Sequence, residues 1–355
     1  MILLSSWAAQ PMHISDFHYD LPSELIAQEP LPSRDASRML IVNRATQEWN
    51  DSQFRVIAQF LNSGDLLVIN DTKVFPARLK GRRLPSGGAV ELVLLREIET
   101  LVWECLAKPA RRLAIGSRIE FGPRLQATLL ELRANGLRVV RFDCSESWER
   151  VLDEVGQTPL PPYIKRAKET LDQDRDRYQT IYAKERGAIA APTAGLHFTP
   201  EIFRHLDGCG VKVARITLHV GYGTFEPVRV HDISRHRVAA EWFTISEEAA
   251  SAINRARQEG RRIVAVGTTT TRALESAAKA GGSVIASSGP TELTIIPGYQ
   301  FRVVDALLTN FHLPQSSLLM LVSAFAEHEL ILKAYAHAVH ERYRFYSYGD
   351  CMLII

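Results

Sequence analysis

Hydrophobic and polar residues alternate with a period of two from about Ala77 to Cys144, the pattern of strands that bury one face. Asn135-Gly136 is a hairpin-turn sequence within this region. The segments that predict strands are Ala89–Leu95, Leu101–Leu106, Ser117–Phe121, Gln126–Leu132 and Leu137–Phe142. Five or six short strands in roughly 70 residues predict a small β-barrel.

After Tyr163 the pattern changes to helices that alternate with apolar strands. Thr199 and Pro200 are typical of a helix start and Gly208 of its end, and Ser246 begins another helix. The other expected elements are strands over Val211–Leu218, Ile263–Val266 and Arg302–Leu308, a helix over Arg272–Ala280 and a last amphipathic helix over Leu330–Val339.

The segment Ile14–Thr72 also lacks the alternating short-strand pattern of the predicted barrel. It predicts a helix over Pro22–Gln28 and strands over Met39–Asn43 and Asp65–Ile69. We therefore expect an α/β (mixed α+β) main domain built from both chain ends, residues 12–75 and 156–355, with a small β-barrel domain of residues 76–155 inserted. Residues 1–11 are expected to be a leader that is disordered or is not translated, with Met12 as the alternative start.

Composition narrows the class of protein. A length of 355 residues suits two domains better than one core. A formal net charge of +2 excludes a strong general field for nucleic acid or membrane, so an RNA-binding surface must come from local clustering of cations. The four cysteines lack the spacing of a disulfide framework, and no apolar run approaches the ~20 residues of a membrane span. We expect a cytoplasmic protein.

Four polar segments, each punctuated by Gly or Pro, separate the apolar runs of the main domain. They are Ala190–Phe198, Leu218–Phe225, Val266–Arg272 and Thr309–Pro314. In the first, Pro192 fixes the backbone, and Gly195 permits a close turn near Thr193 and His197. We expect the four segments to converge on one composite active site.

The third segment joins a buried strand to a helix. Free amides at the helix start, the hydroxyls of Thr268 and Thr269, and the lack of bulk at Gly267 suit a carboxylate or phosphate. Arg272 opposes the helix dipole, so we expect it to pair with an anion or a carboxylate. The alternative is a Thr-rich N-cap without a ligand, and the spacing of a P-loop is absent.

The second segment carries glycines and rings. Gly221 and Gly223 let the backbone approach a ligand, and Tyr222 or Phe225 offers a ring for base stacking, unless the glycines form only a bulge. His236 and Glu241 follow in a polar stretch and suit acid and base roles.

The last segments add an amide and an acid. Asn310 suits hydrogen bonding to a base edge and His312 suits proton transfer, unless Asn310 only closes the turn. Asp350 follows a glycine among aromatic residues and either binds a ribose or cation or caps the chain locally. The sequence has eleven histidines but neither H-E-x-x-H nor paired Cys/His spacing, so we expect no metal.

Cations cluster around the predicted barrel and just after it, where they suit phosphate tracking along RNA or merely a solvated face. The residues expected to bind RNA are Lys73, Arg78, Arg82, Arg83, Arg111, Arg112, Lys165 and Arg166.

Together these segments resemble the S-adenosylmethionine:tRNA ribosyltransferase-isomerase family of queuosine biosynthesis. The resemblance covers Ser15 to Ile355, with Lys73 and Tyr222 as small departures. It is carried by Ser15–Phe17, Leu21-Pro22, Gly64–Val74, Pro159–Ile164, Ala190–Phe198, Thr217–Phe225, Ala265–Arg272, Val303–Pro314 and Tyr343–Asp350.

The resemblance implies transfer of the ribosyl group of S-adenosylmethionine to 7-aminomethyl-7-deazaguanine at the tRNA wobble position. The products are epoxyqueuosine-tRNA, adenine and methionine. It also implies a cytoplasmic monomer without an obligate protein partner, metal or prosthetic group, with S-adenosylmethionine as co-substrate and the tRNA anticodon loop as partner. The rival hypotheses are a tRNA-base exchange enzyme and a non-catalytic RNA-binding module.

The chemistry requires a base at the carbon next to the sulfonium, an acid for adenine and an acceptor for the attacking amine. We expect these catalytic roles to be shared by His197, His219, His236 and His312, assisted by Glu241 or Asp350. The residues expected to bind S-adenosylmethionine or the base are Asn70, Asp71, Thr193, Gly195, Gly221, Gly223, Phe225, Gly267, Thr268, Thr269, Arg272 and Asn310.

Overall fold

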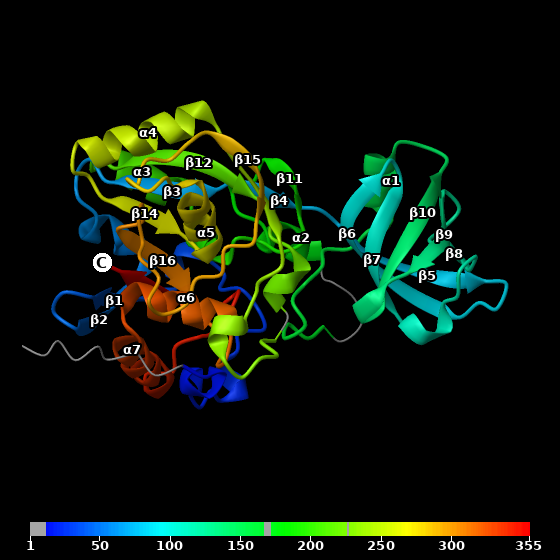
Figure 1. Cartoon of the computed structure of the whole chain (residues 1–355), viewed down its shortest axis with the longest axis horizontal. Helices are drawn as coiled ribbons and strands as arrows, with labels where there is room; N and C mark the ends of the chain where they lie inside the picture. The colour runs from blue at the N-terminus through cyan, green and yellow to red at the C-terminus, as the bar shows by residue number, and fades with distance from the viewer. Residues whose placement is uncertain (1–11, 167–171, 226) are drawn as a thin grey trace, which may run out of the picture.

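The structure is a computed structural model that describes residues 12–166, 172–225 and 227–355. Figure 1 shows a large α/β part and a separate β-barrel joined to it by extended chain segments. The predicted leader, residues 1–11, lies outside the described residues.

A nine-stranded sheet forms the centre of the large part, in the order β15-β13-β12-β3-β14-β16-β17-β1-β2. Its strands are β1 (Arg38–Asn43), β2 (Glu48–Gln53), β3 (Leu66–Asn70), β12 (Lys212–Leu218), β13 (Glu241–Ile245), β14 (Ile263–Val266), β15 (Ser287–Thr291), β16 (Ala306–Asn310) and β17 (Cys351–Ile354). The neighbours β12, β3, β14 and β16 are parallel, so their carboxyl ends meet at one edge. The sheet draws strands from both ends of the chain, as the sequence predicts.

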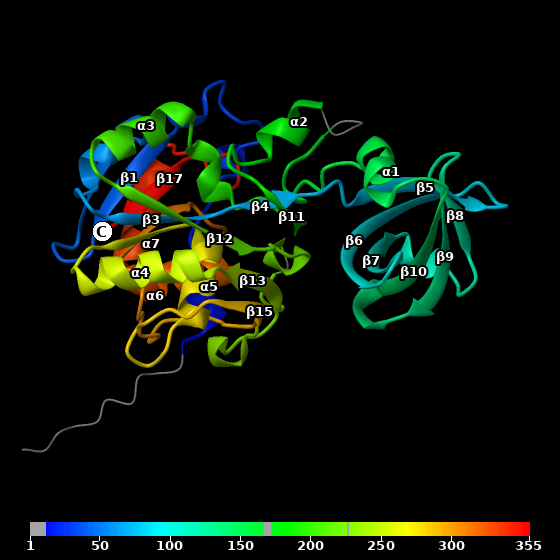
Figure 2. The same ribbon diagram turned by 90° about the horizontal axis from the view of Figure 1, so that it is seen from above.

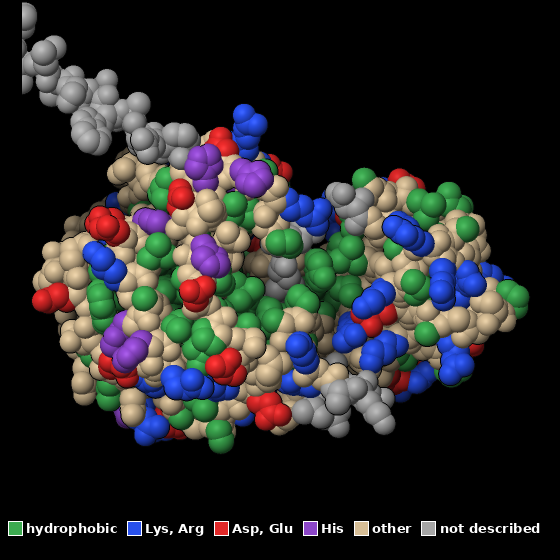
Figure 3. All heavy atoms as spheres, turned by 90° about the horizontal axis from the view of Figure 1, so that it is seen from below, with side chains coloured by type: hydrophobic (Ala, Val, Ile, Leu, Met, Phe, Trp, Pro, Cys, Tyr) green, Lys and Arg blue, Asp and Glu red, His purple; other side chains and the backbone are tan. Residues whose placement is uncertain are grey.

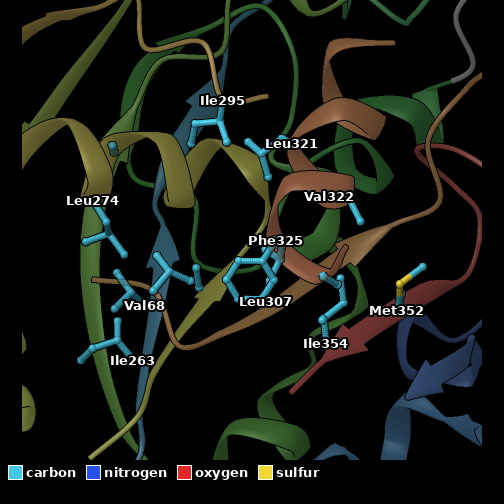
Figure 4. Close-up of a cluster of buried hydrophobic side chains, with 14 of the residues drawn as sticks. Val68, Ile263, Leu274, Ile295, Leu307, Leu321, Val322, Phe325, Met352 and Ile354 are labelled. Carbon is cyan, nitrogen blue, oxygen red and sulfur yellow. The ribbon is translucent and has the colours of Figure 1, made fainter. Parts of the chain in front are cut away.

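Helices cover both faces of this sheet because its strands are apolar on both. The helices are α1 (Trp148–Val155), α2 (Asp172–Arg177), α3 (Pro200–Gly208), α4 (Glu247–Gln258), α5 (Thr268–Ala277), α6 (Ser317–Ala326), α7 (His328–His340) and the 3-10 helix η4 (Phe54–Phe60). Figure 2 shows α3 on one face of the sheet and α4 and α5 on the other. On β3, Val68 belongs to the cluster shared with α4, α5, α6 and α7, whereas Leu67 and Ile69 pack against α3 and η4. Leu274, Leu321 and Phe325 close the first cluster over the sheet (Figure 4).

The barrel is closed, with strand order β10-β7-β6-β5-β8-β9. Its strands are β5 (Arg78–Leu84), β6 (Ala89–Glu99), β7 (Val102–Lys108), β8 (Arg118–Glu120), β9 (Leu125–Leu132) and β10 (Leu137–Cys144). Inward residues such as Leu92, Leu129 and Val140 form its own core. Two short strands, β4 (Thr72–Val74) and β11 (Glu185–Ala188), pair where the chain passes between the two parts.

The predicted fold class, a mixed α/β part with a small closed barrel, is therefore confirmed. The helix predicted over Pro22–Gln28 is wrong, because only Ser23–Leu25 is helical and of 3-10 type. Ala27 N–H donates to the Phe345 carbonyl, and Phe345 N–H donates to the Leu25 carbonyl. The backbone that would continue the helix is thus paired with a segment more than 300 residues away.

Two other boundaries differ from the prediction. The helix expected from Arg272 already begins at Thr268, and the strand expected from Arg302 begins at Ala306. Glu275 explains the second difference, since its carboxylate accepts from the backbone N–H groups of Arg302, Val303 and Val304. No helix among the described residues combines the length and hydrophobicity needed to cross a bilayer.

Candidate active site

The four polar segments meet around one hollow of about 580 Å³ at the carboxyl edge of the parallel strands. Strands β14 and β16 end there at Val266 and Asn310, so the residues that follow them become neighbours in space. We call this space the main hollow. Its lining includes Pro192, Thr193, Ala194, Val220, Thr224, Gly267, Thr268, Thr269, Thr309, Asn310, Phe311 and His312.

Helix α5 points its first turn at the main hollow. Gly267 adopts φ +90° and ψ 154°, a conformation open in practice only to glycine, and this conformation turns the chain from β14 into the helix. Thr270 Oγ1 donates to the Val266 carbonyl at 2.6 Å, so that hydroxyl belongs to the helix itself. Thr268 and Thr269 line the hollow, where the first-turn amides lack intrahelical acceptors. This end of the helix suits an anionic or hydroxyl-bearing group.

His197 is buried beside the main hollow. Its Nδ1 lies 2.8 Å from Ser37 Oγ, and its Nε2 lies 3.4 Å from Asn310 Nδ2. Burial and then the positive charges of Arg34 and Arg344 lower the pKa of His197 to about 4. The ring is therefore neutral near pH 7 and able to accept a proton.

Asn310 bridges His197 and the hollow. Its Nδ2 donates to the Tyr346 carbonyl at 3.0 Å, while its Oδ1 is buried and has no hydrogen-bond partner among the described residues. An open acceptor at the wall of a hollow suits a donor on a bound molecule.

His312 lines the same hollow and is also buried. Its Nε2 lies 2.9 Å from Thr309 Oγ1, and its backbone N–H donates to Tyr335 Oη at 3.1 Å. Tyr19 donates to the His312 carbonyl. Burial alone lowers the pKa of His312 to about 3, so this ring is neutral as well.

A second hollow of about 640 Å³ adjoins the first and shares Thr224, Leu318 and Tyr346 with it. Its wall holds the ion pair of Glu241 and Arg272, both buried.

The prediction that Arg272 pairs with a carboxylate is met by Glu241. The Glu241 carboxylate also accepts from Gly221 N–H at 2.8 Å. Arg272 Nε donates to the Leu293 carbonyl at 3.0 Å, so protein groups already occupy the guanidinium. Arg272 is therefore placed to hold the wall of the second hollow.

His236 and His219 lie outside the main hollow. His236 Nε2 is 2.9 Å from Ser317 Oγ, next to the second hollow, and burial lowers the pKa of His236. His219 Nδ1 is 2.8 Å from Thr72 Oγ1, and burial lowers its pKa against the opposing charges of Asp71 and Glu185.

A cleft of about 1160 Å³ lies between the barrel side and the large part, and His219 and Glu241 reach it from the large part. Trp103 and Trp148 line it from the barrel side and Trp242 from the sheet. Figure 3 shows hydrophobic side chains in the hollow between the two parts and Lys and Arg side chains over the barrel. We call this space the interdomain cleft.

Several predicted site residues have structural partners instead of a place in the main hollow. Asp350 accepts from the backbone N–H groups of Arg38 and Arg344, at 2.9 and 2.8 Å, which is the capping alternative. Asn70 joins β3 to β12 through both backbone groups of Leu218.

Three more predicted residues also lie away from the main hollow. Asp71 accepts from Thr217 Oγ1 at 2.7 Å. Gly195 is required by packing, since a Cβ there would lie 2.1 Å from Tyr182 Oη. Gly223 lines the second hollow, and the side chain of Phe225 lies outside what the structure describes.

The predicted RNA-binding cations fall into two groups. Arg78 pairs with Glu91 at 2.6 Å and Arg166 with Asp174 at 2.7 Å, and Arg83 Nε donates to Ser86 Oγ. The others are exposed and have no carboxylate within ion-pair distance in the described parts of the chain. These free cations are Lys73, Arg82, Arg111, Arg112 and Lys165.

Sequence reasoning missed part of the wall of the main hollow. Tyr163, Tyr178, Leu318, Tyr346 and Ser347 complete it. The aromatic run around Tyr346 is visible in the sequence, but its distance along the chain from the four segments hides its place in the wall. Within the described residues, no group of three or more His, Cys, Asp or Glu side chains is arranged to hold a metal ion.

Comparison with known proteins identifies one family over nearly the whole chain. The family described as "Queuosine biosynthesis protein" matches residues 14–354. Proteins named S-adenosylmethionine:tRNA ribosyltransferase-isomerase from Pelotomaculum thermopropionicum and Desulforamulus reducens are 53% and 48% identical over 345 residues, covering 97% of this chain and all of theirs.

A crystal structure of S-adenosylmethionine tRNA ribosyltransferase from Thermotoga maritima is 38% identical, with a TM-score of 0.56, and the match covers 96% of this chain and all of that one. The sequence match, the shared structure and the converging segments agree. The chain belongs to the queuosine biosynthesis protein family.

Proposed function

We propose that this chain transfers the ribosyl group of S-adenosylmethionine to 7-aminomethyl-7-deazaguanine at the tRNA wobble position and isomerises it, giving epoxyqueuosine-tRNA, adenine and methionine. The names of its relatives support this function. The observation that carries it is the main hollow, where a glycine-opened helix start and the neutral His312 face one space, with the neutral His197 beside it behind Asn310. S-adenosylmethionine is a co-substrate in this proposal, and no prosthetic group or metal takes part.

The main hollow and the second hollow together hold S-adenosylmethionine in this proposal. The first-turn amides of α5 with Thr268 and Thr269 receive a carboxylate or ribose hydroxyls, and Thr193 lines the same wall. Asn310 Oδ1 accepts from the adenine amino group or a ribose hydroxyl. Glu241 and Arg272 hold the second hollow open.

The proton transfers fall to His197 and His312, which are neutral at the wall of the main hollow or one hydrogen bond from it. One removes the hydrogen next to the sulfonium and the other serves the amine or adenine. His236 lies beside the second hollow, where it exchanges protons with a product that leaves. His219 lies at the interdomain cleft, where it exchanges protons with a substrate that enters. Asp350 positions the backbone near Arg344 instead of exchanging protons.

The tRNA enters through the interdomain cleft. An anticodon loop presents unstacked bases, and tryptophan rings are suitable stacking partners for them. The free cations Lys73, Arg82, Arg111, Arg112 and Lys165 hold its phosphates. Arg78, Arg83 and Arg166 support the barrel and its connections through their own partners.

The barrel of residues 76–155 acts as an inserted domain on the main domain of residues 12–75 and 156–355 in this proposal. The isolated bridge between Arg78 and Gln157 supports this division, because the chain leaves and re-enters the main domain at one point. The enzyme works as a cytoplasmic monomer without an obligate protein partner, in the compartment that holds its tRNA. The absence of paired cysteines among its four agrees with a reducing compartment.

Adenine release tests the function directly. Purified protein is incubated with S-adenosylmethionine and tRNA carrying 7-aminomethyl-7-deazaguanine, and adenine is measured in single turnover. Adenine should appear only when both substrates are present. Release without S-adenosylmethionine dependence points to base exchange, and binding without release points to a non-catalytic module.

Alanine variants test the histidines in the same assay. His197→Ala and His312→Ala should slow single-turnover release at least about 100-fold, the usual contribution of a general acid or base. His205→Ala, on the exposed face of α3, is the matched control and should release adenine at the wild-type rate. Wild-type rates for both buried variants would contradict the assignment.

A further inference from the structure

A third hollow, of about 300 Å³, lies on the other side of His197. Arg34 and Arg177 line it together with Ser33, Ser37 and Ser347. Ser347 lines the main hollow as well. We call this space the arginine hollow.

Among the described residues, the two guanidinium groups bind only backbone carbonyls. Arg34 donates to the carbonyls of Leu196 and Asp176, at 3.2 and 2.8 Å. Arg177 donates to the carbonyls of Leu31 and Pro32, at 2.6 and 3.3 Å. Neither forms an ion pair with a carboxylate in the described parts of the chain, so their charges remain uncompensated.

Buried donors remain open beside these charges. Arg177 Nε and Arg344 Nη1 are buried and lack a hydrogen-bond partner among the described residues. Arg344 donates to the Glu29 carbonyl through its other nitrogen. Burial lowers the pKa of both Arg34 and Arg344, because removing a guanidinium group from water disfavours its charged form.

The charged groups around the arginine hollow are therefore mainly positive. The carboxylates of Asp176, Glu29 and Asp350 act on Arg34 or Arg344 only from beyond ion-pair distance. Arg34 and Arg177, which line the hollow, are half-buried and have no carboxylate partner, and the buried Nε of Arg177 is an open donor. Such groups favour a bound anion, because cations withdrawn from water are normally paired.

We infer that the arginine hollow binds an oxyanion of one of the substrates, held by Arg34 and Arg177. The nearby hydroxyls already have partners, since Ser33 donates to the Asp35 carboxylate and Ser347 Oγ lies 2.5 Å from Tyr163 Oη, so the guanidinium groups are the anion's ligands. This inference rests on the proposed function. Guanidinium forks match the two oxygens of a carboxylate or a phosphodiester. The carboxylate is that of the methionyl group of S-adenosylmethionine, and the phosphodiester is that of the tRNA backbone.

The same anion acts on His197. The ring lies between the arginine hollow and Asn310, and the nearby positive charges disfavour its protonation. A bound anion offsets those charges and makes His197 a stronger base only when the substrate is in place. The arginines are thus positioning residues for His197.

The first test uses the wild-type protein and inorganic phosphate as the probe. Histidine ring ¹⁵N NMR follows the pKa of His197 in phosphate and in chloride of matched ionic strength. Phosphate should raise the pKa of His197 by about one unit and leave that of His312, which is shifted by burial alone, in place. His197→Gln identifies the signal. An unchanged His197 at saturating phosphate overturns the inference, and this result is independent of turnover.

The second test identifies the source of the anion. Arg177→Gln should raise the KM of one substrate at least tenfold with a smaller change in kcat. A change for tRNA indicates the phosphodiester and a change for S-adenosylmethionine the carboxylate. Arg204→Gln, on the exposed face of α3, is the matched control. Unchanged KM values for both substrates overturn the inference, and if Arg177→Gln does not fold, the phosphate titration of the wild type decides.

Discussion

Glu241 and Arg272 form an ion pair whose side chains are only 4% and 8% exposed. Glu241 begins β13, and Arg272 lies in the second turn of α5, so the pair ties the antiparallel side of the sheet to the helix that starts at the main hollow. The Glu241 carboxylate also accepts a hydrogen bond from the backbone N–H of Gly221, which holds that segment in place. One carboxylate therefore orders two of the converging segments.

Glu241→Ala should lower the free energy of unfolding by about 3–5 kcal/mol, because it leaves Arg272 buried without a counter-charge. Urea unfolding measures the loss. Glu201→Ala, which removes the exposed pair with Arg204, is the control and should cost at most about 1 kcal/mol. Equal losses for the two variants would show that burial of the first pair has no energetic consequence.

Acid should destabilise the fold through His197 and His312. Their pKa values are depressed to about 4 and about 3 in the folded state, so the unfolded chain binds more protons below its histidine pKa of about 6.5. Their contribution to stability is complete above pH 6.5 and is lost as the pH falls toward those folded values. The expected loss is about 2 kcal/mol for each ring between pH 7 and pH 5.

The predicted loss of stability in acid is checked by measuring the free energy of unfolding as a function of pH. His312→Gln should flatten the slope by about half of the histidine contribution, whatever its own effect on stability. A wild-type slope in His312→Gln would mean that this ring is not held neutral.

Gly267→Ala should cost about 1–3 kcal/mol and weaken S-adenosylmethionine binding. The cost comes from the backbone at φ +90° and not from a clash, since the nearest atoms to an added Cβ are 3.7 Å away. Gly281→Ala is the matched control, because an added Cβ there meets nothing within 4 Å and the residue has no positive φ. Urea unfolding and a binding titration measure both effects, and wild-type values in both would remove the special role of Gly267.

Neutralising exposed cations should weaken tRNA binding without changing the KM of S-adenosylmethionine. For a variant combining Lys73→Gln, Arg111→Gln and Arg112→Gln, the slope of log affinity against log salt should become shallower by about 1 for each phosphate that the protein no longer neutralises. Filter binding over a salt series measures this slope.

The matched control removes three exposed cations from helices of the large part, through Arg204→Gln, Arg255→Gln and Lys333→Gln. It changes the net charge equally. A shallower slope in both variants would assign the effect to net charge and reject a binding surface.

Local signals predict local structure in this chain. Ser246 Oγ accepts from Ala249 N–H and Thr199 Oγ1 from Ile202 N–H, as N-cap residues do, so α3 and α4 begin where the sequence indicates. Alternation predicts the barrel strands because each buries only one face.

Partners far apart in the chain are what the sequence does not reveal. Ser37 meets His197, and Glu241 meets Arg272, through the packing of separate elements. The arginine hollow is similar, since Arg34 and Arg177 come from opposite sides of the barrel insertion. No spacing rule links such residues, because the sheet order that brings them together is set by the whole fold.

Strand β17 lies between β1, which it pairs in parallel, and β16, which it pairs in antiparallel fashion. The main sheet therefore remains split during synthesis, with β1 and β16 presenting unsatisfied edges until Cys351–Ile354 has left the ribosome. A nascent chain that stalls shortly before this point carries two apolar edges open to other chains. The four residues of β17 therefore protect the sheet from edge-to-edge association by covering both edges at once.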